Sequence, residues 1–162
     1  MDWDGFQKVI TERFETDYAA AGGTLPISYP GNPRNNPDDN WIRISWQSGS
    51  TPVGSLRSLS ERHTIFLFAQ IFGPPKQGRV ILLQNAEIIG NIWRGQRYTI
   101  QNNGAGGSSN LPLNGANRID TVAYSTLNLR NPATIPVEVE NTEQEQVNVQ
   151  IEGTLEVKYQ GA

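Results

Sequence analysis

The stretch TIFLFAQIF (64–72) limits the possible folds most, because it is apolar on both sides of an extended chain. The two sides are formed by Ile65, Leu67 and Ile71 and by Phe66, Phe68 and Phe72. Such a strand lies inside a sheet that is covered on both faces. The stretch is about half as long as the roughly 18–20 apolar residues that a membrane span requires, so it predicts a buried strand and no membrane segment.

Regular alternation predicts further strands around it. WIRISW (41–46) alternates strictly, and 147–159 does so most clearly, with Gly153 as a bulge or a point of close approach. LPISYP (25–30) contains a proline within the run, which favours the edge of a sheet. Weaker strand patterns cover 96–101, 118–130 and 135–140.

Two segments have helical periodicity. Residues 2–20 form one apolar stripe that Gly22 or Gly23 ends; it contains Trp3, Phe6, Ile10, Phe14 and Tyr18. A second helix follows GPPKQG (73–78) and continues to Trp93. Its two neighbouring stripes predict broad packing on the sheet; they contain Ile81, Ile88 and Ile92, and Leu82, Ala86, Ile89 and Trp93. We expect a single α+β domain over 1–162, with two helices on one face of a mixed, mostly antiparallel sheet.

Polar segments separate these elements. Ranges 29–40, 47–61 and 102–117 have no apolar period and predict long loops. Charged residues make up only 18% of the 162-residue chain, so its surface is mostly neutral and polar. The chain contains no cysteine, which excludes disulfides and thiolate sites. MDWDGF at the N-terminus lacks the basic and apolar parts of a signal peptide, so a protein made in a cytoplasm is expected.

The net charge of −3 is unevenly distributed. Residues 1–40 contain three basic and seven acidic residues, 41–135 contain nine and three, and 136–162 contain one and six. Two explanations fit this pattern equally well. One is chance together with a solvated acidic tail, and the other is that complementary charges meet across a subunit boundary. The low pI and the absence of a Lys/Arg cluster argue against DNA readout.

No motif predicts catalysis or cofactor binding. GPPKQGRV (73–80) has the glycine spacing of a phosphate loop, but Arg79 and Val80 replace its lysine and hydroxyl residue. NGAGGSSN (103–110) lacks a following helix, so it predicts a loop. His63 is the only histidine and has no second ligand, so it is expected to be a structural or surface residue. The carboxylates of NPDDN (36–40) lack the spacing of a calcium loop. We therefore expect no metal and no cofactor.

Four tryptophans could suggest a carbohydrate platform. Trp3, Trp46 and Trp93 fall on predicted core faces, which leaves Trp41 as the one expected to be free, at the end of a polar loop. One aromatic residue makes a weak sugar platform, and aromatic residues are also favoured at protein interfaces.

The order and spacing of these segments resemble the tail terminator (tail completion) proteins of long-tailed bacteriophages. The likeness covers most of the chain, with 102–117 as an extra loop. The segments that carry it are FQKVITERFETDY, LPISYPGNP, NWIRISW, TIFLFAQIFGPPKQGRVILLQNAEII, YTI and the long C-terminal strand.

The resemblance implies a virion protein of the tail and neck, assembled in the host cytoplasm. Such proteins form a hexameric ring that ends tube polymerisation, and they use no cofactor and catalyse no reaction. Its partners would be the tail tube protein, a neck connector and a sheath where one exists. Genome DNA would pass through the lumen without sequence-specific binding, and no membrane is involved. The expected contact surfaces are the three long loops, with the candidate interface residues Tyr29, Pro30, Asn32, Arg34, Asp38, Asp39, Trp41 and Arg57.

Other classes remain open at this stage. They are another neck connector, a tube or baseplate subunit, a carbohydrate- or ligand-binding module built on Trp41, and a small hydrolase that uses unrecognised carboxylates. Replacement of Trp41 by alanine is expected to weaken assembly more than the monomer fold.

Overall fold

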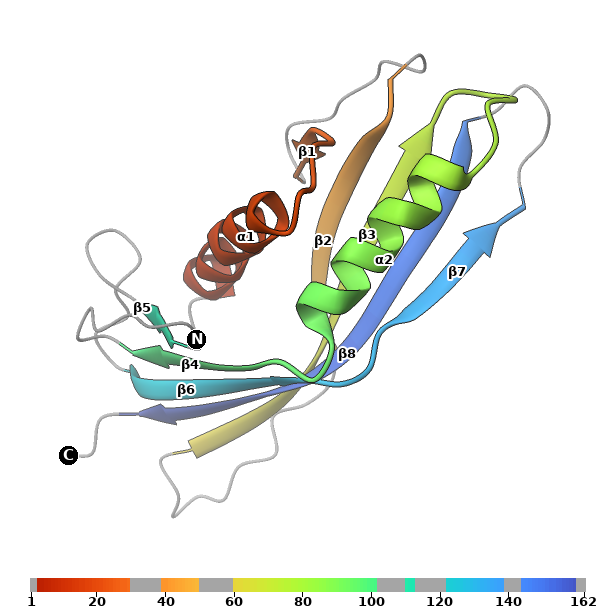
Figure 1. Cartoon of the computed structure of the whole chain (residues 1–162). Coiled ribbons are helices and arrows are strands. Elements are labelled where there is room, and N and C mark those ends of the chain that lie inside the picture. The colour runs from red at the N-terminus through yellow and green to blue at the C-terminus, as the bar shows by residue number, and fades with distance from the viewer. Residues whose placement is uncertain are drawn as a thin grey trace.

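A computed structural model describes residues 3–29, 39–49, 60–101, 110–112, 122–138 and 144–159. The described residues form two helices and eight strands (Figure 1). In chain order they are α1 Trp3–Ala20, β1 Ile27–Ser28, β2 Trp41–Gly49, β3 Ser60–Gly73, α2 Val80–Trp93, β4 Arg97–Gln101, β5 Asn110–Pro112, β6 Val122–Leu129, β7 Ala133–Val137 and β8 Glu145–Tyr159.

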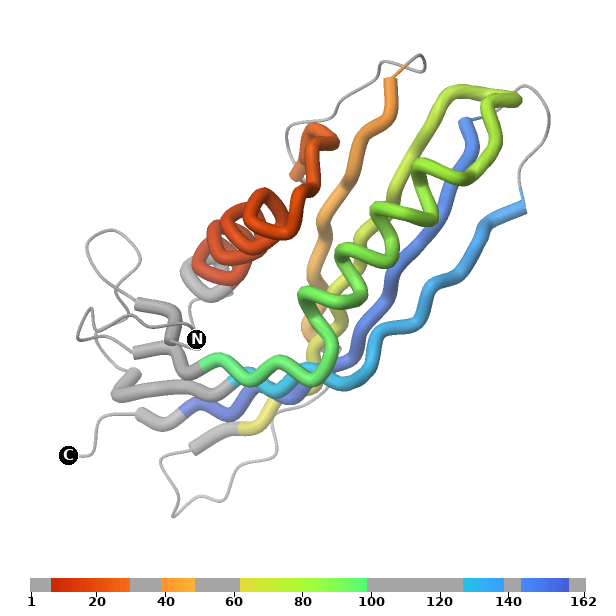
Figure 2. Tube along the Cα trace, viewed as in Figure 1, coloured from red at the N-terminus to blue at the C-terminus, as the bar shows by residue number. Residues whose placement is uncertain are grey.

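All eight strands belong to one sheet. Its order is β1-β2-β3-β8-β6-β4-β5, and β7 pairs with β8 outside this path. The pairs β1/β2 and β4/β5 are parallel and the others are antiparallel, so the sheet is mixed and mostly antiparallel. Figure 2 follows β3 and β8 side by side through the middle of the sheet.

Both helices lie on the same face of this sheet (Figure 1). We call the face toward α1 and α2 the inner face and the opposite one the outer face. The predicted α+β architecture, with two helices on one face of the sheet, is confirmed.

The inner face carries most of the hydrophobic core. On β3, residues Ile65, Leu67, Ala69 and Ile71 alternate inward and are at most 2% exposed. The inward residues of β8 are equally buried; they are Val147, Val149, Ile151, Leu155 and Val157. Alternation places Phe66, Phe68 and Phe72 on the outer face, where each is only half-buried.

Helix α1 follows its predicted stripe. Ile10, Phe14 and Tyr18 are buried, and Val9 joins them in the core. Gly22, with φ +87°, ends the helix in the left-handed conformation that the sequence predicts there. The side chains of Trp3 and Phe6 lie outside the described set.

Helix α2 packs more narrowly than its sequence predicts. Leu82, Ala86, Ile89 and Trp93 are buried as expected, together with Asn85 and Gly90. The second predicted stripe does not pack on the sheet in the same way: Ile81 is 48% exposed, and Ile88 and Ile92 are half-buried at the margin of the core. The expectation of broad packing therefore fails at Ile81, whereas Ile88 and Ile92 pack against the core cluster.

Gly153 marks a close approach between strands, one of the two predicted alternatives. A Cβ atom at this position would lie 2.9 Å from Leu129 Cδ2 and 3.0 Å from the Asn128 carbonyl oxygen. The register shift of the β6/β8 pair lies instead between Val122 and Tyr124 on β6.

The loop predictions need three corrections. Residues 47–49 extend β2 and residues 60–61 begin β3, so this loop is shorter than predicted. Within 102–117, the residues Asn110–Pro112 form β5, which pairs in parallel with Thr99–Gln101 of β4. Backbone pairing with β4 produces this strand without any apolar period, which explains why the sequence pattern missed it. The remainder of the three predicted loops lies mostly outside the described residues.

In the described part of the chain, no helix combines the length and the apolar character that crossing a bilayer requires.

Candidate assembly surface

The structure describes three of the eight candidate interface residues: Tyr29, Asp39 and Trp41. The other five, Pro30, Asn32, Arg34, Asp38 and Arg57, lie outside the described residues. Asp39 is exposed and directly precedes β2.

Trp41 is buried, so the expectation that it is free was wrong. It is 3% exposed and lies on the outer face, where it pairs across the strands with Phe72. The two rings stack with their centroids 4.3 Å apart. The indole Nε1 is buried without a hydrogen-bond partner. Because this ring is covered, it does not supply the exposed platform that the carbohydrate-binding alternative requires.

Arg43 lies over this aromatic pair. Its guanidinium carbon is 5.3 Å from the centroid of Trp41 and 5.6 Å from that of Phe72, within the range of cation–π attraction. Arg43 is half-buried, and no carboxylate among the described residues forms an ion pair with it. The outer face therefore presents a positive charge that is held over two aromatic rings.

A row of aromatic residues continues along β3 from this point. Phe68 and Phe66 follow Phe72 on the same side, with ring centroids 6.4 Å apart. Together with Trp41 we call these three phenylalanines the outer aromatic row. Sequence reasoning expected them to be covered, yet no helix of the described residues lies over them. The double-sided apolar pattern of 64–72 was the signal that could have identified a surface for a partner.

Polar and charged groups border the row on its β8 side. Gln146, Asn148 and Gln150 are the cross-strand neighbours of Phe72, Gln70 and Phe68. Farther along, Arg62 pairs with Glu156, and Arg130 Nη1 lies 3.2 Å from Glu152 Oε1. An apolar centre with a polar border is the usual composition of a protein interface.

Tyr29 does not join this surface. Its side chain packs against the inner core cluster, and its hydroxyl donates a hydrogen bond to Glu15 on α1. Burial raises the pKa of Tyr29, and the Glu15 carboxylate acts in the same direction. The structure therefore places Tyr29 and Trp41 on opposite sides of the sheet and does not bring them into one site.

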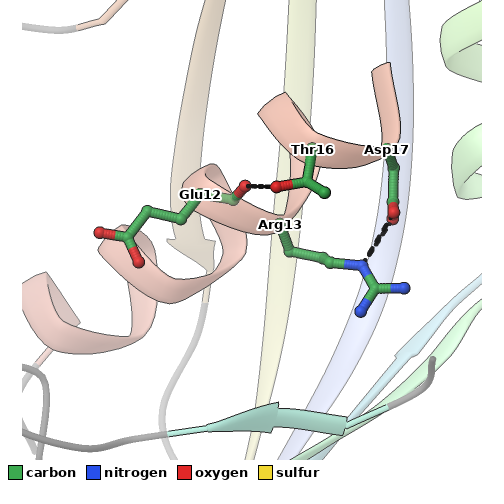
Figure 3. A network of polar contacts seen from close by, with 4 residues as sticks. All are labelled: Glu12, Arg13, Thr16 and Asp17. Carbon is green, nitrogen blue, oxygen red and sulfur yellow. Dashed lines mark hydrogen bonds and ion pairs between the residues drawn. The ribbon is translucent and has the colours of Figure 1, made fainter. Parts of the chain in front are cut away.

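The polar contacts of α1 are structural (Figure 3). Arg13 Nε donates to both carboxylate oxygens of Asp17, at 2.9 and 2.8 Å, and the Thr16 hydroxyl donates to the Glu12 carbonyl oxygen. The Arg13 guanidinium also lies over the ring of Tyr98, 5.9 Å from its centroid. Burial raises the pKa of Tyr98 to about 12, the Asp17 carboxylate adds to this, and Arg13 opposes it. This cluster ties α1 to β4.

A second buried contact links the two helices. The Tyr18 hydroxyl donates to Asn85 Oδ1 and accepts a hydrogen bond from the backbone N–H of Leu25. Asn85 Nδ2 in turn donates to the Ile81 carbonyl oxygen at 2.8 Å. Burial raises the pKa of Tyr18, against the Leu25 hydrogen bond. Both buried polar side chains are satisfied, which is typical of a structural contact.

The described residues contain no arrangement that resembles a catalytic centre. A cavity between α1, α2 and β4 measures about 10 Å³, which is about the space of one water molecule. Arg79, in the glycine-rich turn, donates to Glu145 and to the Val137 carbonyl, so it is already engaged. His63 is 5% exposed on the inner side of β3, as expected of a structural residue. Within these residues no three His, Asp or Glu side chains gather as metal ligands.

Comparisons with known proteins add a limited finding. No family model and no curated protein matches the chain. One solved structure is similar over 96% of this chain and 98% of its own, with 13% sequence identity and a TM-score of 0.47. Its name states no activity, and similarity at this level supports no functional argument.

Proposed function

We propose that this chain is a structural subunit of a bacteriophage tail, a terminator that forms a ring of six copies at the head-proximal end of the tail tube. In this role it ends tube polymerisation and joins the tail to the neck. It binds the tube protein and a connector through protein contacts and catalyses no reaction. The order and spacing of the sequence segments, described above, suggested this class.

The outer aromatic row is the observation that carries the proposal. Phe66 and Phe68 lie together on the outer side of a central strand, and Phe72 follows beyond Gln70; such apolar groups on one sheet face mark interaction sites. A ring subunit must bury surface on neighbours at two positions, and the sheet face over which no helix of the described residues lies supplies one of them. The engaged arginine of the glycine-rich turn argues against a phosphate site at that turn.

Size and shape in solution test the proposal. We expect light scattering of the purified chain, at concentrations up to about 100 µM, to detect a sixfold assembly, and electron microscopy to show rings. Added tail tube protein should favour the rings, and tubes that carry a ring should stop growing at that end. Isolated monomers under all these conditions would contradict the proposal.

Two variants make the test specific. Phe68→Gln removes apolar surface from the outer aromatic row but keeps an extended side chain, so we expect it to prevent ring formation while the monomer remains folded by circular dichroism. The matched control is Lys8→Gln on the exposed side of α1, with 55% of the Lys8 side chain exposed. Rings of equal stability in both variants would show that the outer face is not an interface.

A further inference from the structure

The solvent side of α2 carries a second apolar surface. Val80, Ile81 and Leu83 are 69%, 48% and 43% exposed, although all three belong to the first turn of a helix that is otherwise anchored in the core. When a partner covers exposed aliphatic residues that lie this close together, the removal of their apolar surface from water lowers the free energy of the complex. We call Val80, Ile81, Leu83 and the exposed Glu87 the α2 surface.

This surface and the outer aromatic row lie on opposite sides of the molecule. Helix α2 covers the inner face of the sheet (Figure 1), so its solvent side points away from the sheet. Strand alternation places the aromatic row on the opposite, outer face. One copy cannot bring its own two surfaces together. Two different surfaces on opposite sides of a subunit can meet between copies only head to tail, and such contacts close into rings when the rotation permits.

The charges of the two surfaces are complementary. Arg43 presents a guanidinium above Trp41 and Phe72, and the described residues provide no acidic partner for it. Glu87 is exposed on α2, one helical turn after Leu83, and has no ion pair among the described residues. Opposite charges set beside apolar groups orient an interface and disfavour other arrangements.

The spacing of apolar and charged groups also agrees. Leu83 and Glu87 are four residues apart, which is about 6 Å along a helix axis. On the outer face, the Arg43 guanidinium carbon is 5.6 Å from the ring centroid of Phe72. A helix laid on this face can therefore place Leu83 against Phe72 and Glu87 against Arg43 at the same time.

We infer that the α2 surface of one copy packs on the outer aromatic row of the next copy, with a Glu87–Arg43 ion pair at the contact. The partner on the outer face is thus a second copy of this chain, bound head to tail. The inference rests on the self-assembly in the proposed function and specifies its contact. This contact also explains why 64–72 is apolar on both sides, because each sheet is then covered on one face by its own helices and on the other by a neighbour's helix.

Charge reversal tests the pairing. Arg43→Glu and Glu87→Arg should each raise the protein concentration needed for half-assembly by about tenfold or more, since like charges then oppose each other at every contact. The double variant restores opposite charges and should assemble at nearly the wild-type concentration. The inference would be overturned if the half-assembly concentration of the double variant were raised by the product of the two single-variant factors. Thermal melts of the isolated subunits check that each variant folds.

A cross-linking experiment reports the orientation independently. The natural chain has no cysteine, so Leu83→Cys and Gln70→Cys each introduce a single thiol, on α2 and on the outer face beside Arg43. With a short bismaleimide, we expect covalent dimers when the two variants are mixed and few with either alone. Dimers of Gln70→Cys alone would indicate sheet-to-sheet packing and overturn the inference, as would intact rings without cross-links. Absence of any wild-type assembly would instead contradict the proposed function itself.

Discussion

The two faces of the sheet differ in how completely the chain covers them. On the inner face, the central residues of β3 and β8 are at most 2% exposed beneath α1 and α2. On the outer face, the phenylalanines of the same strand β3 are half-buried, and their neighbours on β8 are polar. One strand thus carries an apolar set for its own helices and another that these helices do not reach. An apolar pattern indicates that a strand face will be buried, but it does not indicate whether the same chain or a neighbouring molecule covers that face.

Trp41 is an exception to this difference between the faces, because it lies on the outer face but is buried like a core residue. We expect Trp41→Ala to reduce the free energy of unfolding of the isolated subunit by about 3–5 kcal/mol, the usual cost of removing a buried large aromatic side chain. Chemical denaturation under monomeric conditions measures it. Trp41→Phe is the control and should cost less, because it keeps stacking on Phe72 and removes an N–H that has no partner. A loss below about 1 kcal/mol for Trp41→Ala would place the ring in the assembly contact instead.

A pair of adjacent residues on β3 sharpens the comparison. Leu67 is 2% exposed on the inner face and Phe68 is half-buried on the outer face. Leu67→Ala should destabilise the subunit by about 2–5 kcal/mol, whereas Phe68→Ala should cost about 1 kcal/mol, because less area leaves contact with protein. Assembly should respond in the reverse order, with Phe68→Ala the more damaging once both variants are folded. Equal losses of unfolding free energy would mean that the chain covers both faces equally.

Much of the fold follows from local patterns. The stripe of α1, the glycine that ends it, the alternation of β2 and β8 and the central place of 64–72 are all visible in residue spacing. Three features depend on contacts between distant segments. Strand β5 forms by pairing with β4, and the length of β2 matches its pairing along β3. The exposure of Ile81 depends on which side of α2 faces the sheet.

The candidate surface was harder to predict for the same reason. Trp41 was expected to be free because it follows a polar loop. Its burial depends instead on the residue opposite it on β3, which is Phe72, and the loop sequence does not reveal that pairing. Tyr29 is near Trp41 in sequence and lies on the other side of the sheet against α1. The three phenylalanines were recognised as one side of a strand, yet periodicity alone cannot distinguish cover by the same chain from cover by a neighbour.

Gly153 tests how completely the inner side of the sheet is filled. In Gly153→Ala the added methyl group would lie 2.9 Å from Leu129 Cδ2, 3.0 Å from the Asn128 carbonyl oxygen and 3.2 Å from Ile65 Cγ1. Because one of these atoms is backbone, the strands must separate slightly, and we expect a loss of about 1–3 kcal/mol in unfolding free energy. Gly90→Ala on α2 is the matched control: its methyl group meets only Pro132 Cγ at 3.6 Å, and alanine favours a helix by about 0.5–1 kcal/mol. Thermal melts should therefore move in opposite directions for the two variants. A stabilising Gly153→Ala would mean that β6 and β8 can accommodate an added methyl group at this close approach.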